Sequence, residues 1–150
     1  MLDLLVSITV SYMLFSLITY IFQGAALYKA NELENIKPKW IAWIPVINIY
    51  SVLKLGGKST GYVKYYVFSF FSILILGLFE YSDYINLVMI VIVAIYLLTI
   101  VISIQAYITI SRNYNISPVW FIIGSIIPPA MIIAYIIFYN VLNKEFEKIQ

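Results

Sequence analysis

Charged residues occur in only a few short segments of this 150-residue chain, and four long stretches between them carry no charge. The stretches are residues 4–28, 65–79, 84–110 and 118–143. A helix needs about 20 mostly apolar residues to cross the hydrocarbon core of a bilayer, which is about 30 Å thick. Three of the stretches reach that length, so the pattern predicts a polytopic membrane protein.

The composition supports one helical membrane domain. Apolar residues make up 63% of the chain and charged residues 11%, whereas about 25% is the usual charged fraction of a soluble domain. A water-soluble fold of this length could not hide so much apolar surface. We expect a single integral membrane domain, residues 1–150, of the all-α class.

The residue types that most often carry chemistry are missing. The chain contains no Cys and no His, which removes disulfides, thiol nucleophiles, the commonest metal ligand and the commonest general base. Its carboxylates fall in expected loops or near the chain ends, so no acidic pair is expected inside a span. We therefore predict a protein that is not an enzyme, uses no metal or cofactor and does not bind nucleic acid.

The segment 41–57 decides the predicted topology. A helix that began at Pro45, a favourable first helical position, and ended at Gly56 would be about 15 Å long, which is too short to cross a bilayer. We expect this segment to lie in the membrane interface, or to enter the bilayer and return.

Polar and aromatic side chains in the same segment agree with an interfacial position. Asn48, Ser51 and Lys54 are spaced by three residues and form a narrow polar stripe on a helix. Trp43 and Tyr50 are suited to the headgroup level, where rings with one polar edge are favoured. An interfacial helix that only anchors the bundle is the simplest interpretation.

A returning segment also gathers the basic residues on one side. Six lysines then lie on the face that we assign to the cytoplasm, namely Lys29, Lys37, Lys39, Lys54, Lys58 and Lys64. A crossing segment would split them between both faces. The predicted protein has four transmembrane helices, at about 4–28, 61–79, 84–110 and 118–142, in the plasma membrane. Both termini are expected outside the cell, with Glu80 and Asp83 in a tight external turn.

Two of the expected spans carry polar side chains at helical spacing. Thr19 and Gln23 belong to such a seam in the first span, and Thr99 and Ser103 belong to one in the third. In lipid, hydroxyl and small side chains supply close packing and hydrogen bonds between helices, worth about 0.6 kcal/mol each on average. Helix contact is the favoured interpretation, and a polar conduit is the alternative.

The last expected span contains Pro128-Pro129 close to its middle. Because proline cannot donate a backbone hydrogen bond, we predict a kink there. Such a break can form a hinge, a gate or a substrate site. Prolines are also tolerated in membrane helices when neighbours satisfy the freed carbonyls, and packing is the favoured interpretation.

Residues 40–58 contain a recognisable motif. A Trp precedes an Ile-Pro-x-x-Asn-x-Tyr core, and a Lys-x-x-Gly-Lys ending follows. The residues that match are Trp40, Trp43, Ile44, Pro45, Asn48, Tyr50, Lys54, Gly57 and Lys58. The motif resembles that of a family of small bacterial membrane proteins without an assigned activity, and the likeness extends over about residues 37–138. The resemblance implies a multi-pass membrane protein with an accessory role.

These observations lead to two functional hypotheses. The first is a non-enzymatic accessory or modulator subunit that acts through protein or lipid contacts, with Lys54 and Lys58 touching anionic lipid or an acidic partner. The alternative is a small homo-oligomeric transporter or channel, which needs a wet path past Thr19, Gln23 or Ser103. The expected partners are membrane lipids, together with another membrane protein or further copies of the chain.

Overall fold

A computed structural model describes residues 2–79, 83–125 and 127–148, and its regular elements within these ranges are all helices. In chain order they are α1 (Leu2–Leu33), η1 (Lys39–Trp43), α2 (Ile49–Leu55), η2 (Thr60–Tyr62), α3 (Val63–Phe79), α4 (Ile85–Asn113), α5 (Val119–Gly124) and α6 (Pro128–Glu147). The predicted all-α class is confirmed.

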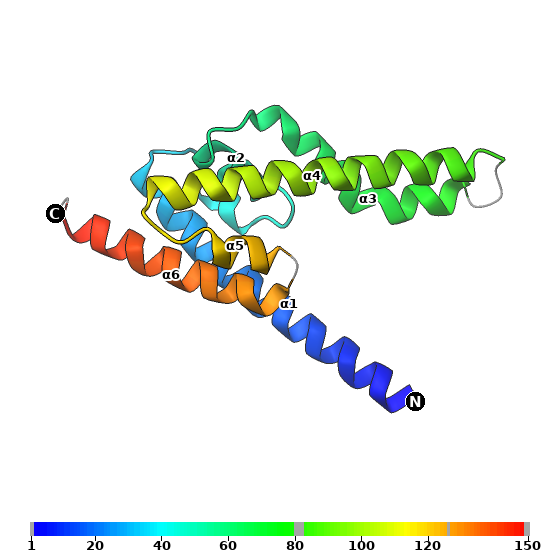
Figure 1. The fold of residues 1–150 in the computed structure, drawn as a ribbon, viewed down its shortest axis with the longest axis horizontal. Coiled ribbons are helices and arrows are strands. Elements are labelled where there is room, and N and C mark those ends of the chain that lie inside the picture. Colours follow the sequence, from blue (N-terminus) through cyan, green and yellow to red (C-terminus); the bar gives the residue numbers. More distant parts are fainter. Residues whose placement is uncertain (1, 80–82, 126, 149–150) are drawn as a thin grey trace.

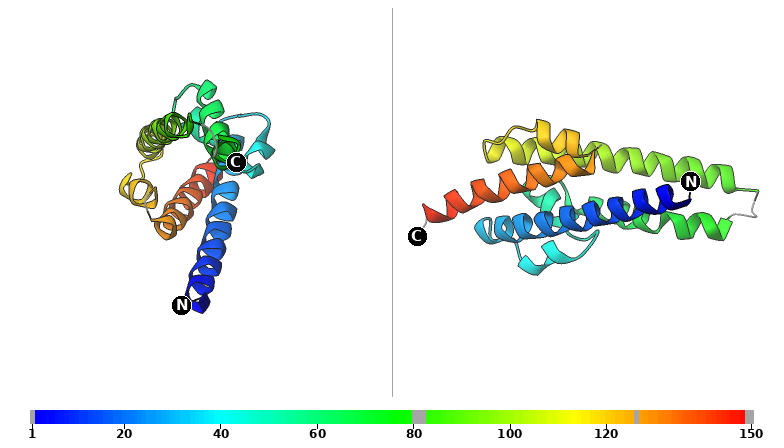
Figure 2. Two further views of the ribbon diagram at one scale, coloured as in Figure 1. Left: turned by 90° about the vertical axis from the view of Figure 1, so that its right-hand side faces the viewer. Right: turned by 90° about the horizontal axis from the view of Figure 1, so that it is seen from below.

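Figure 1 shows two arms that diverge from a common base. One arm is the N-terminal half of α1, and the other is the antiparallel pair α3–α4. The base combines the C-terminal halves of α1 and α4 with α2, α5 and α6. Both views in Figure 2 keep α6 beside α1, and the view from below places the two chain termini at opposite ends of the molecule.

The core lies in the base and is built around an aromatic cluster. Phe121 of α5 stacks on Tyr107 of α4, with ring centroids 4.8 Å apart. Its ring also meets Tyr135 and Phe138 of α6 edge-on, at 5.7 and 6.3 Å. Edge-on and offset pairs of this kind add about 0.5–1.5 kcal/mol each to the burial of the rings. The cluster joins three helices and positions the rest of the base.

The arms carry most of their apolar side chains on the outside. Two helices, over Thr9–Leu33 and Ile85–Asn113, are long and apolar enough to cross a membrane. In each, only 17% of an apolar 18-residue window is buried, so these are not core helices of a water-soluble fold. Continuous apolar surface of this extent is not tolerated in water. The arms therefore indicate membrane association.

The segment 118–142, expected to be a fourth kinked span, is instead divided between two helices that fold back on each other (Figure 1). α5 ends at Gly124, and the prolines occupy the first two positions of α6. Proline is favoured at a helix start because the first N–H groups have no helical partner. A Cβ on Gly124 would stand 2.7 Å from the backbone of Met131, so glycine permits the close return. Pro128-Pro129 start a helix and do not kink one.

This return changes the position of the C-terminus. α6 runs back toward the end of the molecule where α4 ends, so the C-terminus lies there and the N-terminus lies at the far end of α1 (Figure 1). The arrangement does not support the expectation that both termini lie on one face of a membrane, because α5 and α6 fold back on each other and do not form one continuous helix.

Two local boundaries also differ from expectation. The first span, expected to end at about residue 28, belongs to a helix that continues through Leu33, because the Lys, Ala, Glu and Leu residues there are good helix formers. The helix expected to begin at Pro45 begins at Ile49, because residues 45–48 form a turn in which Val46 has φ +67°. A positive φ is costly for a β-branched residue and requires support from the surrounding packing.

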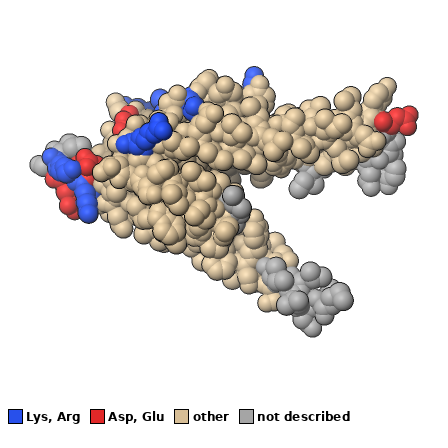
Figure 3. All heavy atoms as spheres, viewed as in Figure 1, with Lys and Arg blue, Asp and Glu red and all other residues tan. Residues whose placement is uncertain are grey.

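The basic side chains gather at the base. Figure 3 shows Lys and Arg mainly over the base, where acidic atoms also lie, and further acidic atoms at the tip of the α3–α4 arm. Lys29, Lys54, Arg112 and Lys144 belong to helices of the base, and Lys64 lies in the first turn of α3. Asp83 lies in the turn before α4, whereas Glu80 lies outside the described residues.

The close approach of α2 to α4 gives a first prediction. A Cβ on Gly56 would lie 2.6 Å from the Cα of Ala106, so Gly56→Ala forces two backbones apart. We expect it to lower the free energy of unfolding by about 1–3 kcal/mol, measured by thermal unfolding in detergent. Gly77→Ala is the matched control, because a Cβ there meets nothing within 4 Å. Equal midpoints for the two variants would contradict this account of the crossing.

The returning hairpin gives a second prediction. The chain has no native Cys, so single cysteines can report sidedness. In sealed vesicles, an impermeant maleimide is expected to label Lys37→Cys and Glu147→Cys from the same side, and Asp83→Cys from the opposite side. Labelling of Glu147→Cys together with Asp83→Cys would instead require α5–α6 to cross.

Candidate interfacial site

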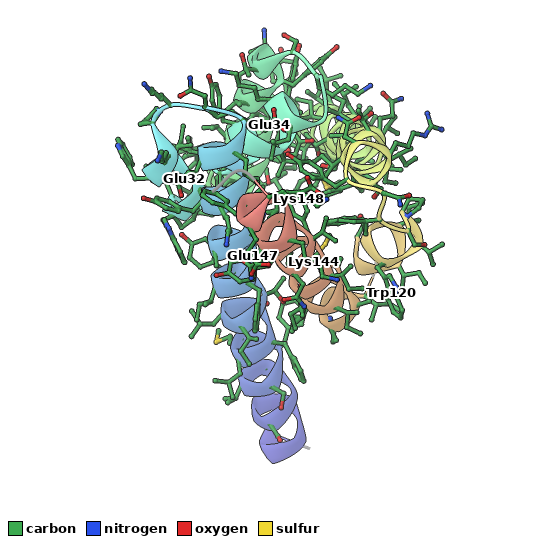
Figure 4. The ribbon with its side chains drawn as sticks, turned by 90° about the vertical axis from the view of Figure 1, so that its left-hand side faces the viewer. Glu32, Glu34, Trp120, Lys144, Glu147 and Lys148 are labelled. Atoms are coloured by element: carbon green, nitrogen blue, oxygen red, sulfur yellow. The ribbon has the colours of Figure 1, made fainter. Side chains whose placement is uncertain are left out.

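The candidate site is a cleft of about 380 Å³ in the base, between the end of α1, α2 and the end of α4. Its polar lining consists of Glu34, Lys54, Thr109, Asn113 and Tyr114, with Gly57 at one side. A second cleft of about 380 Å³ shares Glu34, Asn113 and Tyr114 with the first and reaches Glu145. Figure 4 looks onto this end, with Glu34 directly after α1, Lys144 and Glu147 on α6, and Lys148 directly after α6.

Tyr114 positions the carboxylate that both clefts share. Its hydroxyl donates a 2.8 Å hydrogen bond to Oε1 of Glu34, which joins the end of α4 to the end of α1. Burial raises the pKa of Tyr114, and the hydrogen bond to Glu34 and the charges of Glu34 and Glu145 raise it further. The phenol therefore stays protonated and continues to donate at neutral pH.

The two lysines of the sequence motif have different surroundings. Lys54 is exposed and lines the first cleft, with its Nζ 5.7 Å from the centre of the Tyr50 ring. Lys58 donates a 2.8 Å hydrogen bond from Nζ to Oε1 of Gln105 on α4. Gly57, at φ +63°, makes the turn between them, a conformation that glycine adopts without strain. The end of the motif thus holds the C-terminus of α2 against α4, and Lys54 is the motif lysine that lines the cleft.

The other polar residues of the motif are not exposed. Asn48 and Ser51 are buried, and Ser51 accepts a 2.8 Å hydrogen bond from Nδ2 of Asn31 on α1. The expected polar stripe on α2 therefore faces the protein interior except at Lys54. Asn31 was not singled out from the sequence, because a single Asn beside the apolar stretch gives no sign that its side chain is buried. Its Oδ1 is buried and has no protein partner among the described residues.

Trp43 and Pro45 serve local packing. The Trp43 ring covers Gly24, where a Cβ would lie 2.6 Å from ring atom Cε3. Tyr20 of α1 donates a hydrogen bond to the carbonyl of Trp43. Pro45 accepts a 2.7 Å hydrogen bond from the Ile47 N–H within the turn before α2. Trp43 remains 42% exposed, as a side chain at the headgroup level should be.

The polar seams do not converge on one path. Gln23 of α1 lies near the Tyr135 hydroxyl of α6, whereas Ser103 hydrogen-bonds at 2.7 Å to Tyr66 of α3. Both contacts join neighbouring helices, as expected for seams that hold helices together. Thr19 bonds only within its own helix, to the carbonyl of Phe15 at 2.7 Å.

Part of the α4 seam does line a groove. Thr99 and Ser103, together with Tyr107 of α4 and Ser125 beside α5, border a groove of about 310 Å³. The Thr99 hydroxyl is satisfied within α4 by the carbonyl of Tyr96 at 2.8 Å. Because the groove holds no charged side chain, its chemistry is limited to weak hydrogen bonding.

No group of three or more acidic residues that could hold a metal ion occurs in the described parts of the chain. No protein-family model, curated protein or solved structure matches the chain. The candidate site therefore rests on its own geometry.

The buried Asn31–Ser51 bond gives a third prediction. Ser51→Ala removes the acceptor of a fully buried amide, which typically costs about 1–3 kcal/mol because the donor is left unpaired. Ser16→Ala, on the exposed arm of α1, is the control. We expect a lower unfolding midpoint in detergent for Ser51→Ala alone. If both variants match the wild type, the amide has found another partner.

Proposed function

We propose that this protein is a non-enzymatic, multi-pass membrane protein that acts as an accessory or modulator subunit through lipid and protein contacts. The observation that carries the proposal is the division into a packed base and two arms with outward apolar surfaces. Side chains on the arms that remain unburied can pack against lipid or another membrane helix. Van der Waals contact and interhelical hydrogen bonds drive such association in lipid.

The proposed topology has three crossing helices. α1, α3 and α4 cross the plasma membrane, and the α5–α6 hairpin enters and returns. α3 has 17 described residues, about 25 Å at 1.5 Å per residue, so it is the shortest of the three. The basic base faces the cytoplasm, because basic residues are favoured on that side. This arrangement replaces the fourth crossing expected from the sequence.

The base provides the second kind of contact. Lys54 lies in the last turn of α2 and Lys58 lies in the short segment that follows, and we place both against lipid headgroups or an acidic partner. Basic residues near the anionic leaflet contribute about 1 kcal/mol each to membrane attraction. The motif that contains both lysines is also the basis for the proposed relationship to the small bacterial membrane proteins whose motif it resembles.

A small homo-oligomeric transporter is the second candidate, and the groove beside Thr99 and Ser103 is the observation that favours it. Several copies would be needed, since the polar seams within one chain do not meet. The accessory role fits better, because Gln23 and Ser103 already hold helices together.

The test is to extract the protein gently from the membrane of the cells that produce it naturally and to measure the mass of the complex. The expected result is a stoichiometric complex with a different, larger membrane protein. A complex that contains only copies of this chain would contradict the accessory role and favour the transporter, which flux measurements in vesicles would then address.

A further inference from the structure

Two opposite charges line the same cleft in the base. Glu34 at the end of α1 and Lys54 of α2 both border the 380 Å³ space. The ion pairs within the described residues are Lys39–Glu32 and Lys148–Glu145, so Glu34 and Lys54 are not paired with each other. A carboxylate and an ammonium that share a cleft without an ion pair can each bind one end of a ligand.

One oxygen of the Glu34 carboxylate is held by Tyr114, and the other remains available to a ligand. Oε1 of Glu34 accepts the Tyr114 hydroxyl, whereas Oε2 receives no hydrogen bond from the described residues. A carboxylate has about four lone-pair sites, so it can accept further donors. Glu145, in the adjoining cleft, is already paired with Lys148, so Glu34 is the carboxylate that remains for a ligand. This side of the cleft favours a cation that carries N–H groups.

The opposite side favours an anion. Lys54 offers three N–H donors, and Thr109 and Asn113 add polar groups to the same lining. Ile36 and Leu55, both buried, form an apolar part of the lining. Trp40 is 60% exposed at the same end of the molecule, where a Trp ring marks the headgroup level of a bilayer. The cleft is thus placed where lipid headgroups lie.

We propose that this cleft binds the phosphoethanolamine group of a zwitterionic lipid, with the phosphate against Lys54 and the primary ammonium against Glu34. The inference rests on the proposed lipid-contacting function and names the ligand class for that contact. Charge-assisted hydrogen bonds to both ends distinguish this headgroup from two others. A choline headgroup has no N–H to donate to Glu34, and a glycerol headgroup has no cation.

The test titrates the purified full chain in detergent with short-chain phosphatidylethanolamine, phosphatidylcholine and phosphatidylglycerol of identical acyl chains. We expect phosphatidylethanolamine to bind about tenfold more tightly than the other two, since its ammonium alone can donate charge-assisted hydrogen bonds to Glu34. Binding is measured by native mass spectrometry. Equal affinity for the three lipids overturns the inference.

Two substitutions test which side chain binds the ammonium of the headgroup and which binds the phosphate. Glu34→Gln still accepts the Tyr114 hydroxyl but lacks the charge, so it is expected to remove the preference for phosphatidylethanolamine. Lys54→Gln is expected to weaken all three lipids. Glu147→Gln and Lys37→Gln are matched controls, because both residues are exposed and line neither cleft. A preference that survives Glu34→Gln overturns the inference, as does a Lys54→Gln variant with unchanged binding.

Two further measurements separate the possible outcomes. Free phosphoethanolamine that binds as tightly as the lipid would support the zwitterion site and assign it to a soluble ligand. Unfolding midpoints of Glu34→Gln and Lys54→Gln are expected to match the wild type, since both side chains are exposed. If the protein forms a complex with a partner in natural membranes but shows no headgroup preference, the lipid inference is overturned and the accessory role is not. Absence of any partner would overturn the accessory role independently of the lipid titration.

Discussion

The base of the molecule depends on the aromatic contact that holds the α5–α6 hairpin against α4. α5 has six residues, too few to form a stable helix in isolation. Its Phe121 ring is completely buried between Tyr107 and the rings of α6, so tertiary packing maintains this helix. With the hairpin in place, α6 provides the surface on which the C-terminal half of α1 packs.

The candidate cleft follows from the same packing. α1 continues to Leu33, which carries Glu34 to the end of α4, where Tyr114 follows the last helical residue. α2 fills the remaining side because Gly56 lets its end approach Ala106 closely. The cleft is therefore formed by three helix ends that meet at the polar end of the bundle. Its charges lie there because burial of an unpaired charge at the bilayer centre is costly.

The difference in packing between the base and the arms gives the proposed function its physical basis. Within the base, bonds such as Asn31–Ser51 and Tyr107–Tyr135 join polar side chains of neighbouring helices. The arms leave apolar side chains facing outward, where lipid or a partner helix can contact them. A packed base with outward apolar arms suits a protein that binds neighbours in the membrane.

The sequence by itself determined the all-α class and the membrane character, because both depend on local composition and on the length of uncharged stretches. It also placed the ends of α3 and α4 within a few residues. Pro128-Pro129 were recognised as a break, but proline allows both a kink and a new helix start, so the sequence could not choose between them.

Only the tertiary structure decided that choice, through the close approach of Gly124 to Met131 and the rings around Phe121. The same holds for the site. Lys54 was found from its motif, whereas Glu34 and Tyr114 are 80 residues apart in the chain and are brought together only by folding. Hydrophobic periodicity reports which face of a helix is apolar, but contacts between distant helix ends depend on how the helices pack.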